Sequence, residues 1–153
     1  MFSLAIWDQT KKKLVLARDR YGEKPLYWSK IDNGLIFASE MKSILAHPSA
    51  KKDLNHLAVY QYFSFDYVPQ PFTIFKEINK LENGSFLIFE NNQITIKRFY
   101  NIKIEKSKIN FQESKIKLEK LLDNAVPQQI PRRGSLQVLC RHLSRAGGHL
   151  PTD

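Results

Sequence analysis

The sequence contains a single cysteine, Cys140, and no long hydrophobic run. One cysteine excludes an internal disulfide framework. No apolar run approaches the ~20 residues that a membrane-spanning helix needs. The N-terminus also lacks a basic segment followed by a long apolar stretch, so no signal peptide is expected. Together these absences lead us to expect a cytoplasmic protein.

Hydrophobic residues make up 42% of the 153 positions, and aromatic residues make up 12%. This length and composition are typical of a folded domain with a sizeable core, and they argue against disorder. The net charge of +9 raises the alternative of a nucleic-acid-binding protein. However, the only contiguous lysine runs are Lys11–Lys13 and Lys51–Lys52, and neither lies among aromatic residues in an RNA-reading pattern. The charge pattern therefore favours solvated turns over a nucleic-acid partner.

The first part of the chain alternates short apolar runs with polar turns. Such runs predict strands, and four of them occur in order: Phe2–Trp7, Leu14–Ala17, Pro25–Trp28 and Leu35–Ala38. The polar stretches Asp8–Lys13 and Asp32–Gly34 suit hairpin connections. A short helix is then expected from Ser39 to Leu45, with Ser39 as its N-cap and Glu40 in its first turn.

The remainder of the chain predicts two longer helices around further strands. Asp53 is expected to cap a helix over residues 54–63 in which Leu54, Leu57, Ala58 and Gln61 share one face. Asp66–Phe72 contains two prolines and predicts an extended loop. Strands are expected after this loop at Thr73–Phe75, Ser85–Phe89 and Gln93–Arg98. Ile78–Leu81 leads to a turn signal at Asn83-Gly84, and the last two strands are expected to form a hairpin around Glu90-Asn91-Asn92.

An amphipathic helix is predicted over Phe111–Val126, with Asn110 as a candidate cap. Its apolar face would carry Phe111, Leu118, Leu121, Leu122 and Ala125. Strands in hairpins followed by separate helices indicate an α+β fold built on antiparallel β-sheet.

Several residues are candidates for a functional role. The cluster Arg18-Asp19-Arg20 could bind an acidic substrate, or it could lock a turn between two strands through charge-assisted hydrogen bonds. The turn role is favoured, because no nucleophile lies nearby. Gly22 is expected in a conformation that other residues avoid. Glu40 would need a pKa raised by burial to act as a general acid, so a capping role is favoured.

His56 lacks a second metal ligand four residues away on the same helix face, so it is expected at the surface. Cys140 is expected to be an incidental thiol. The sequence therefore assigns no catalytic, cofactor-binding or metal-binding residue.

Five segments in register carry a family resemblance: AIWD, LARDRYGEKPLYW, FASEMKSILAHP, YQYFSFDYVPQPFTIFKEINKLENGSFLIF and RFYNI. They closely resemble glutamine-dependent asparagine synthetases, in the last part of the class II amidotransferase domain with its N-terminal nucleophile. The resemblance covers roughly residues 1–126. It implies an α+β fold that is the second half of this amidotransferase sandwich.

The resemblance also implies a division of the chain. Residues 1–100 would be the C-terminal part of the amidotransferase domain and 101–110 a linker. Residues 111–126 would be the first helix of the synthetase domain, and 127–153 a non-matching tail. In the resembled family, glutamine is hydrolysed to ammonia, and ATP with Mg²⁺ activates aspartate for attack by that ammonia.

The catalytic equipment of the family is expected to be missing from this chain. The family nucleophile is a cysteine exposed by removal of the initiator Met, whereas Phe2 follows Met1 here. We therefore expect a fragment that is inactive alone. The alternatives are a non-catalytic module that complements a separate nucleophile-bearing piece, or a basic nucleic-acid binder.

The tail differs in composition from the rest of the chain. Residues 132–153 contain 4 Arg, no Lys and no aromatic residue, whereas residues 1–131 contain 17 Lys and 3 Arg. The family would have a Ser-Gly-Gly-x-Asp-Ser loop here, and Gly147-Gly148 does not match it. The change favours a frameshift near residue 127 over a genuine basic tail, and the composition predicts disorder.

Overall fold

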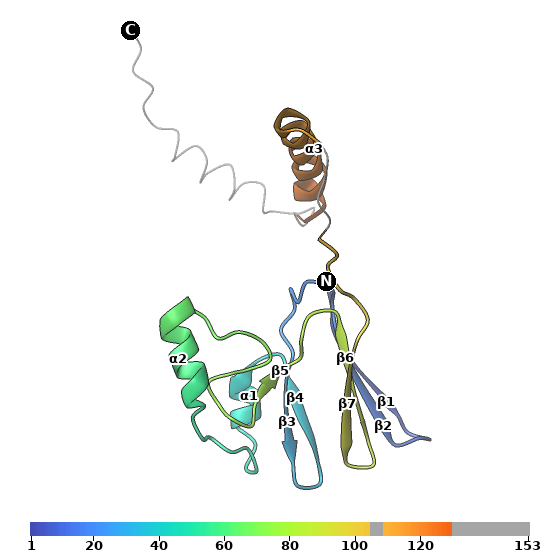
Figure 1. Ribbon diagram of the computed structural model, residues 1–153. Coiled ribbons are helices and arrows are strands. Elements are labelled where there is room, and N and C mark those ends of the chain that lie inside the picture. The colour runs from blue at the N-terminus through green and yellow to red at the C-terminus, as the bar shows by residue number, and fades with distance from the viewer. Residues whose placement is uncertain (105–108, 130–153) are drawn as a thin grey trace. The chain divides into compact units, whose positions relative to one another are not determined.

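The computed structural model describes residues 1–104 and 109–129 (Figure 1). The chain divides into two compact units, Met1–Lys103 and Ile104–Asp153. The expected α+β class is confirmed, because the described residues form two antiparallel sheets and three helices. The expected tail, apart from residues 127–129, lies outside the described residues, as do Cys140 and Gly147-Gly148.

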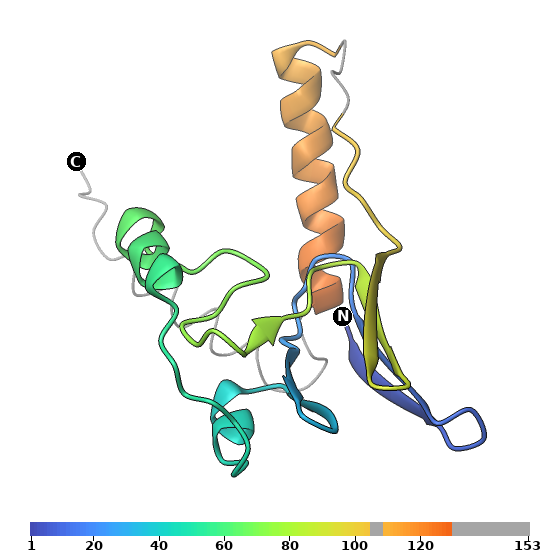
Figure 2. The ribbon, with the colours of Figure 1, turned by 60° about the horizontal axis from the view of Figure 1, so that its bottom comes forward.

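The larger sheet has four strands in the order β1-β2-β6-β7: Ser3–Asp8, Lys13–Arg18, Ser85–Glu90 and Gln93–Arg98. Two hairpins, β1–β2 and β6–β7, lie side by side in both views (Figures 1 and 2). They are joined by antiparallel pairing of β2 with β6, in a register that sets Leu16 opposite Leu87. The central strands therefore come from distant parts of the chain.

The smaller sheet has the order β4-β3-β5: Gly34–Ala38, Tyr27–Ile31 and Asn79–Lys80. The turn at Asp32-Asn33 closes the β3–β4 hairpin, as the sequence predicted. Helix α1, Met41–Leu45, follows β4 directly and buries Ile44.

The main core collects leucines from both sheets and from the segments beside them. Burial alternates along β2, which turns Leu14, Leu16 and Arg18 inward. The buried cluster consists of Leu14, Leu16, Leu26, Leu81 and Leu87, with Trp28, Leu35, Phe89 and Ile94 packed against it. This core holds the turn after β2 against the chain that leads into β6.

Both predicted N-caps of the first two helices are wrong. Helix α1 begins after Glu40, which makes no side-chain capping bond, so neither Ser39 nor Glu40 caps it as expected. Helix α2 is His56–Phe65, and its cap is Asn55, whose side chain accepts from the Ala58 N–H. Asp53 instead accepts from the Lys76 N–H through its backbone carbonyl.

Long-range pairing explains the later start of α2. Leu54 forms an isolated antiparallel bridge with Phe75, and the Asn55 N–H donates to the Ile74 carbonyl. The backbone is therefore extended where a helix was predicted. Of the predicted helix face, Ala58 is buried, whereas Leu54 and Leu57 are about half exposed.

Two predicted strands are also misplaced. The strand expected at Pro25–Trp28 is β3, which begins only at Tyr27. Thr73–Phe75 is not a strand beyond the single bridge of Phe75, because the Thr73 hydroxyl closes a local turn with Phe75 and Ile78. The two residues of β5 pair with Tyr27 and Trp28 of β3.

Helix α3, Phe111–Gln129, is longer than predicted and runs through Pro127. Its predicted cap is confirmed, because the Asn110 side chain accepts from the Glu113 N–H. The predicted apolar face is solvent-exposed in this structure at Phe111, Leu118, Leu121 and Leu122. None of the helices in the described part of the chain is long and apolar enough to cross a membrane.

Candidate functional site

The turn that follows β2 is built around the carboxylate of Asp19. One oxygen accepts from the N–H groups of Tyr21, Gly22 and Glu23, at 3.1, 2.8 and 3.2 Å. The other accepts from Phe2 and Lys24, at 3.3 and 3.2 Å. The carbonyl of Asp19 also accepts from the Gly84 N–H at 2.8 Å. Asp19 thus organises its own turn and ties it to two distant segments.

Electrostatics keep this buried carboxyl ionised. Burial raises its pKa, but the backbone hydrogen bonds from Lys24, Glu23, Tyr21 and Phe2 outweigh burial and lower the pKa of Asp19 to about 2. A general acid or base works best with a pKa near the working pH. The Asp19 carboxylate is therefore suited to holding structure and unsuited to proton transfer.

Arg18 is 7% exposed and holds the same turn from the other side. Its guanidinium donates to the carbonyls of Lys24, Leu81 and Gly22, at 2.8, 2.7 and 2.6 Å. Burial lowers the pKa of Arg18, and the negative charge of Asp19 opposes this shift. The predicted turn-locking role is confirmed for Arg18 and Asp19.

Gly22 adopts φ +68°, as the sequence predicted. The glycine is needed for a second reason that the sequence did not indicate. A Cβ at this position would lie 1.9 Å from Oδ1 of Asn83. Gln70 holds Asn83 in turn: its side-chain Nε2 donates to Oδ1 of Asn83 at 3.0 Å, and its Oε1 accepts from the Asn83 backbone N–H at 3.1 Å.

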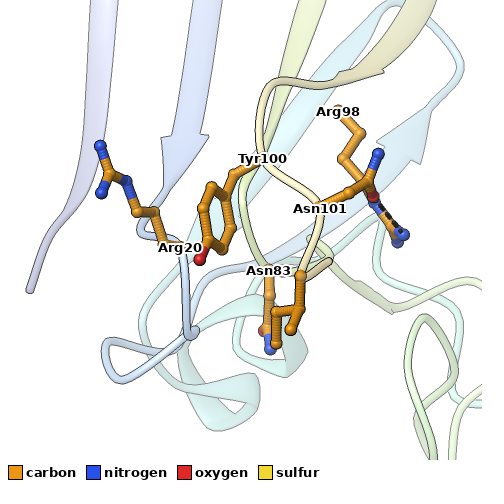
Figure 3. A pocket seen from close by; sticks show the side chains of 6 residues that line it. Arg20, Asn83, Arg98, Tyr100 and Asn101 are labelled. Carbon is orange, nitrogen blue, oxygen red and sulfur yellow. Dashed lines mark hydrogen bonds between the residues drawn. The ribbon is translucent and has the colours of Figure 1, made fainter. Parts of the chain in front are cut away.

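Arg20 lies outside this lock, at a pocket of about 330 Å³ lined by Arg20, Asn83, Arg98, Tyr100, Asn101 and Ile102 (Figure 3). Its guanidinium stands over the Tyr100 ring, 5.2 Å from the ring centroid. The hydroxyls of Tyr21 and Tyr100 are 3.4 Å apart, and their rings meet edge to face. Arg98 is paired with Glu82 and donates to Asn101 at 3.3 Å.

This pocket offers hydrogen bonding and a cation–π contact, and its lining contains no Ser, Thr, Cys, Lys, His or carboxylate side chain. Within residues 1–104 and 109–129, no three His, Cys, Asp or Glu side chains are grouped to hold a metal ion. Sequence reasoning missed Tyr100 and Asn83 as partners of the turn. The Asn83-Gly84 pair was visible only as a turn signal, and nothing local connects it to Gly22.

The other candidate residues lie apart from this turn. Glu40 is exposed and pairs with Lys42 at 2.6 Å. His56 is exposed at the start of α2, as expected. Lys11 and Lys12 lie in the β1–β2 turn, and Lys51 and Lys52 in the segment before α2, all exposed. The structure brings none of these residues together with Arg18 or Asp19.

Comparisons with family models and with known proteins point to the same family. Residues 1–100 match the family model described as a glutamine amidotransferase domain. The chain is 32% identical over 131 residues to the glutamine-hydrolyzing asparagine synthetase 3 of Bacillus subtilis, which covers 85% of this chain and 21% of the relative. A putative glutamine-hydrolyzing asparagine synthetase 2 of Methanocaldococcus jannaschii is 35% identical over 130 residues, or 82% of this chain and 25% of the relative.

A shorter match is closer in sequence. The glutamine-hydrolyzing asparagine synthetase 2 of Bacillus subtilis is 51% identical over 55 residues, which is 36% of this chain and 7% of the relative. The chain thus spans at most about a quarter of the length of these relatives. Because the family model matches about two thirds of the chain, the chain belongs to the glutamine amidotransferase domain family.

Proposed function

We propose that residues 1–100 serve as the C-terminal scaffold of a glutaminase domain in an asparagine-synthetase-like enzyme, the second half of its N-terminal-nucleophile sandwich. The observation that carries the proposal is the family match over this range together with the locked turn. Five backbone N–H groups saturate the Asp19 carboxylate, so the most elaborate polar cluster here has a structural role. On this proposal residues 101–110 are a linker and 111–126 begin the synthetase domain.

The parent activity would be cytoplasmic, ATP-dependent amidation of aspartate or a related carboxylate, with ammonia released from glutamine. Mg²⁺ and ATP belong to that activity in the family, but the described residues do not fit them. No suitable group of metal-binding side chains is present among them, and the sequence contains no Ser-Gly-Gly-x-Asp-Ser phosphate loop. We assign neither ligand to this chain, nor any catalytic residue.

The exposed surface of the edge strand β1 is an argument for a partner that completes the domain. Its central residues Leu4–Trp7 are all exposed and carry no charge. An uncharged apolar strand with a free edge is an unusual surface for a soluble domain, because it invites pairing. We propose that this edge receives the nucleophile-bearing part of the glutaminase domain, supplied separately.

The test mixes the full chain with the segment of Bacillus subtilis asparagine synthetase 3 that precedes the matched region. It measures the release of ammonia from glutamine. We expect no activity from the chain alone and restored activity from the mixture. Ile6→Lys, on β1, should abolish restoration. Ile96→Lys, on the opposite edge strand β7 and similarly exposed, should not. A mixture no more active than its separate parts would refute complementation.

A further inference from the structure

Arg18 carries a buried positive charge that the adjacent Asp19 carboxylate offsets only in part, because burial still lowers its pKa. Its three hydrogen bonds all go to backbone carbonyls, which bear no net charge. The adjacent Asp19 carboxylate accepts from backbone N–H groups instead. None of the ion pairs found in residues 1–104 and 109–129 includes Arg18. A buried charge is costly unless an opposite charge compensates it.

Lys80 adds a second cation nearby. It is half-buried on β5, and its Nζ donates to the Val68 carbonyl at 2.8 Å. Burial lowers the pKa of Lys80, and the positive charge of Arg18 lowers it further. No ion pair of the described residues includes Lys80 either. Two cations that repel each other therefore lie close together, and neither forms an ion pair in the described part of the chain.

Both cations line one pocket of about 350 Å³, whose walls are completed by Tyr27, Tyr67 and the Val68–Gln70 segment. This pocket shares no lining residue with the pocket at Arg20 and Tyr100. A guanidinium has five N–H donors and an ammonium three. The hydrogen bonds to carbonyls use three donors of Arg18 and one of Lys80. Both groups thus retain donors for a ligand.

We propose that this pocket binds a small oxyanion, phosphate or a carboxylate, through Arg18 and Lys80. A guanidinium and an ammonium form strong charge-assisted hydrogen bonds to either group. The bound anion would supply the negative charge that the pocket lacks. Because Lys80 is the more accessible of the two cations, it is the better position for a test. The proposal is independent of the glutaminase scaffold role.

The experiment titrates the full wild-type chain with inorganic phosphate, and separately with acetate, at constant ionic strength maintained with chloride. Backbone amide NMR shifts report where each anion binds. We expect saturable shifts concentrated at Val68, Gln70 and Lys80. Saturation by phosphate alone or by acetate alone identifies the preferred source of the oxyanion. Shifts that stay linear for both anions, or that spread evenly over surface lysines, overturn the proposal.

Variants then test the assignment to Lys80. Lys80→Met should weaken binding at least about tenfold, and Lys80→Arg should keep it within about threefold. The matched control is Lys76→Met, an exposed lysine outside the pocket, which removes the same charge. Equal losses in Lys76→Met and Lys80→Met would show a net-charge effect and overturn the proposal. If Lys80→Met does not fold, the wild-type shifts decide the question.

Discussion

Gly22 and Asn83 occupy adjoining space although they are far apart in the sequence. A Cβ built on Gly22 would lie 1.9 Å from the side-chain oxygen of Asn83. The turn after β2 and the turn before β6 are therefore fitted to each other. This fit depends on an absent side chain, so it can be tested by adding one.

Gly22→Ala should lower the free energy of unfolding by about 2 kcal/mol or more, because it combines positive-φ strain with a steric overlap. The matched control is Gly34→Ala. Gly34 has no positive φ, and the atoms nearest to its added Cβ would be 3.7 Å away, so its change should stay below about 1 kcal/mol. Urea unfolding measures both. Equal effects would mean that the Gly22 turn relaxes freely.

Asp19 should make stability depend on pH at low pH. Its pKa is lowered from 3.8 to about 2 in the folded state, so its stabilising contribution is present above about pH 4. That contribution is lost as the pH falls towards 2, and amounts to about 2 kcal/mol. Denaturant unfolding between these pH values measures it.

Asp19→Asn should remove this part of the pH dependence and destabilise the protein at neutral pH. Asp53→Asn serves as the control, because Asp53 is exposed and is held through its backbone carbonyl. Its pH profile should match that of the wild type. A wild-type profile that persists in Asp19→Asn would contradict the assignment.

Thr73 should be sensitive to loss of its hydroxyl. The side chain is 1% exposed, donates to the Ile78 carbonyl at 2.7 Å and accepts from the Phe75 N–H at 3.1 Å. Thr73→Val removes the partner of the buried Ile78 carbonyl and of the partly buried Phe75 N–H, and should cost about 1–3 kcal/mol of unfolding free energy. Thr95→Val, at an exposed position of β7, should be nearly neutral. Thermal unfolding of both variants measures the two losses of stability. Equal losses in Thr73→Val and Thr95→Val would contradict the special role of the Thr73 hydroxyl.

Tyr21 should control the titration of Tyr100. Its hydrogen bond to Tyr100, together with its own charge at high pH, raises the pKa of Tyr100. Tyr21→Phe removes both effects, so the pKa of Tyr100 should fall. Ultraviolet or NMR titration of the tyrosines measures this shift. Tyr60→Phe, on exposed α2, should leave Tyr100 unchanged, and an unchanged Tyr100 in Tyr21→Phe would refute the coupling.

The strands of the larger sheet could be predicted because their signal is local. Apolar runs such as Leu14–Ala17 and the turn at Asn91-Asn92 lie within a few residues of the hydrogen bonds that they specify. Asn110 was recognised as a helix cap for the same reason, because its partner Glu113 is three residues away. The family motifs are similarly local, and the match over residues 1–100 confirms them.

The predicted start of α2 was wrong because distant contacts overrule local preference. Asp53 is a good capping residue, but its carbonyl and the neighbouring Leu54 are engaged by the Phe75–Lys76 segment. The helix therefore begins only at His56. Likewise, Pro25 was expected to start a strand, whereas the strand needs the pairing of Tyr27 with Lys80.

Composition, periodicity and turn residues were sufficient for the α+β class, most hairpins and the turn-locking role of Arg18 and Asp19, but not for the position of Arg20 outside that lock. Long-range packing determined the strand order β1-β2-β6-β7, the fit of Gly22 to Asn83 and the meeting of Arg18 with Lys80 in one pocket. The physical reason is the separation along the chain of the groups that interact. A turn or cap is stabilised by atoms a few residues away, whereas a pocket exists only after separate segments are pressed together by burial of their leucines.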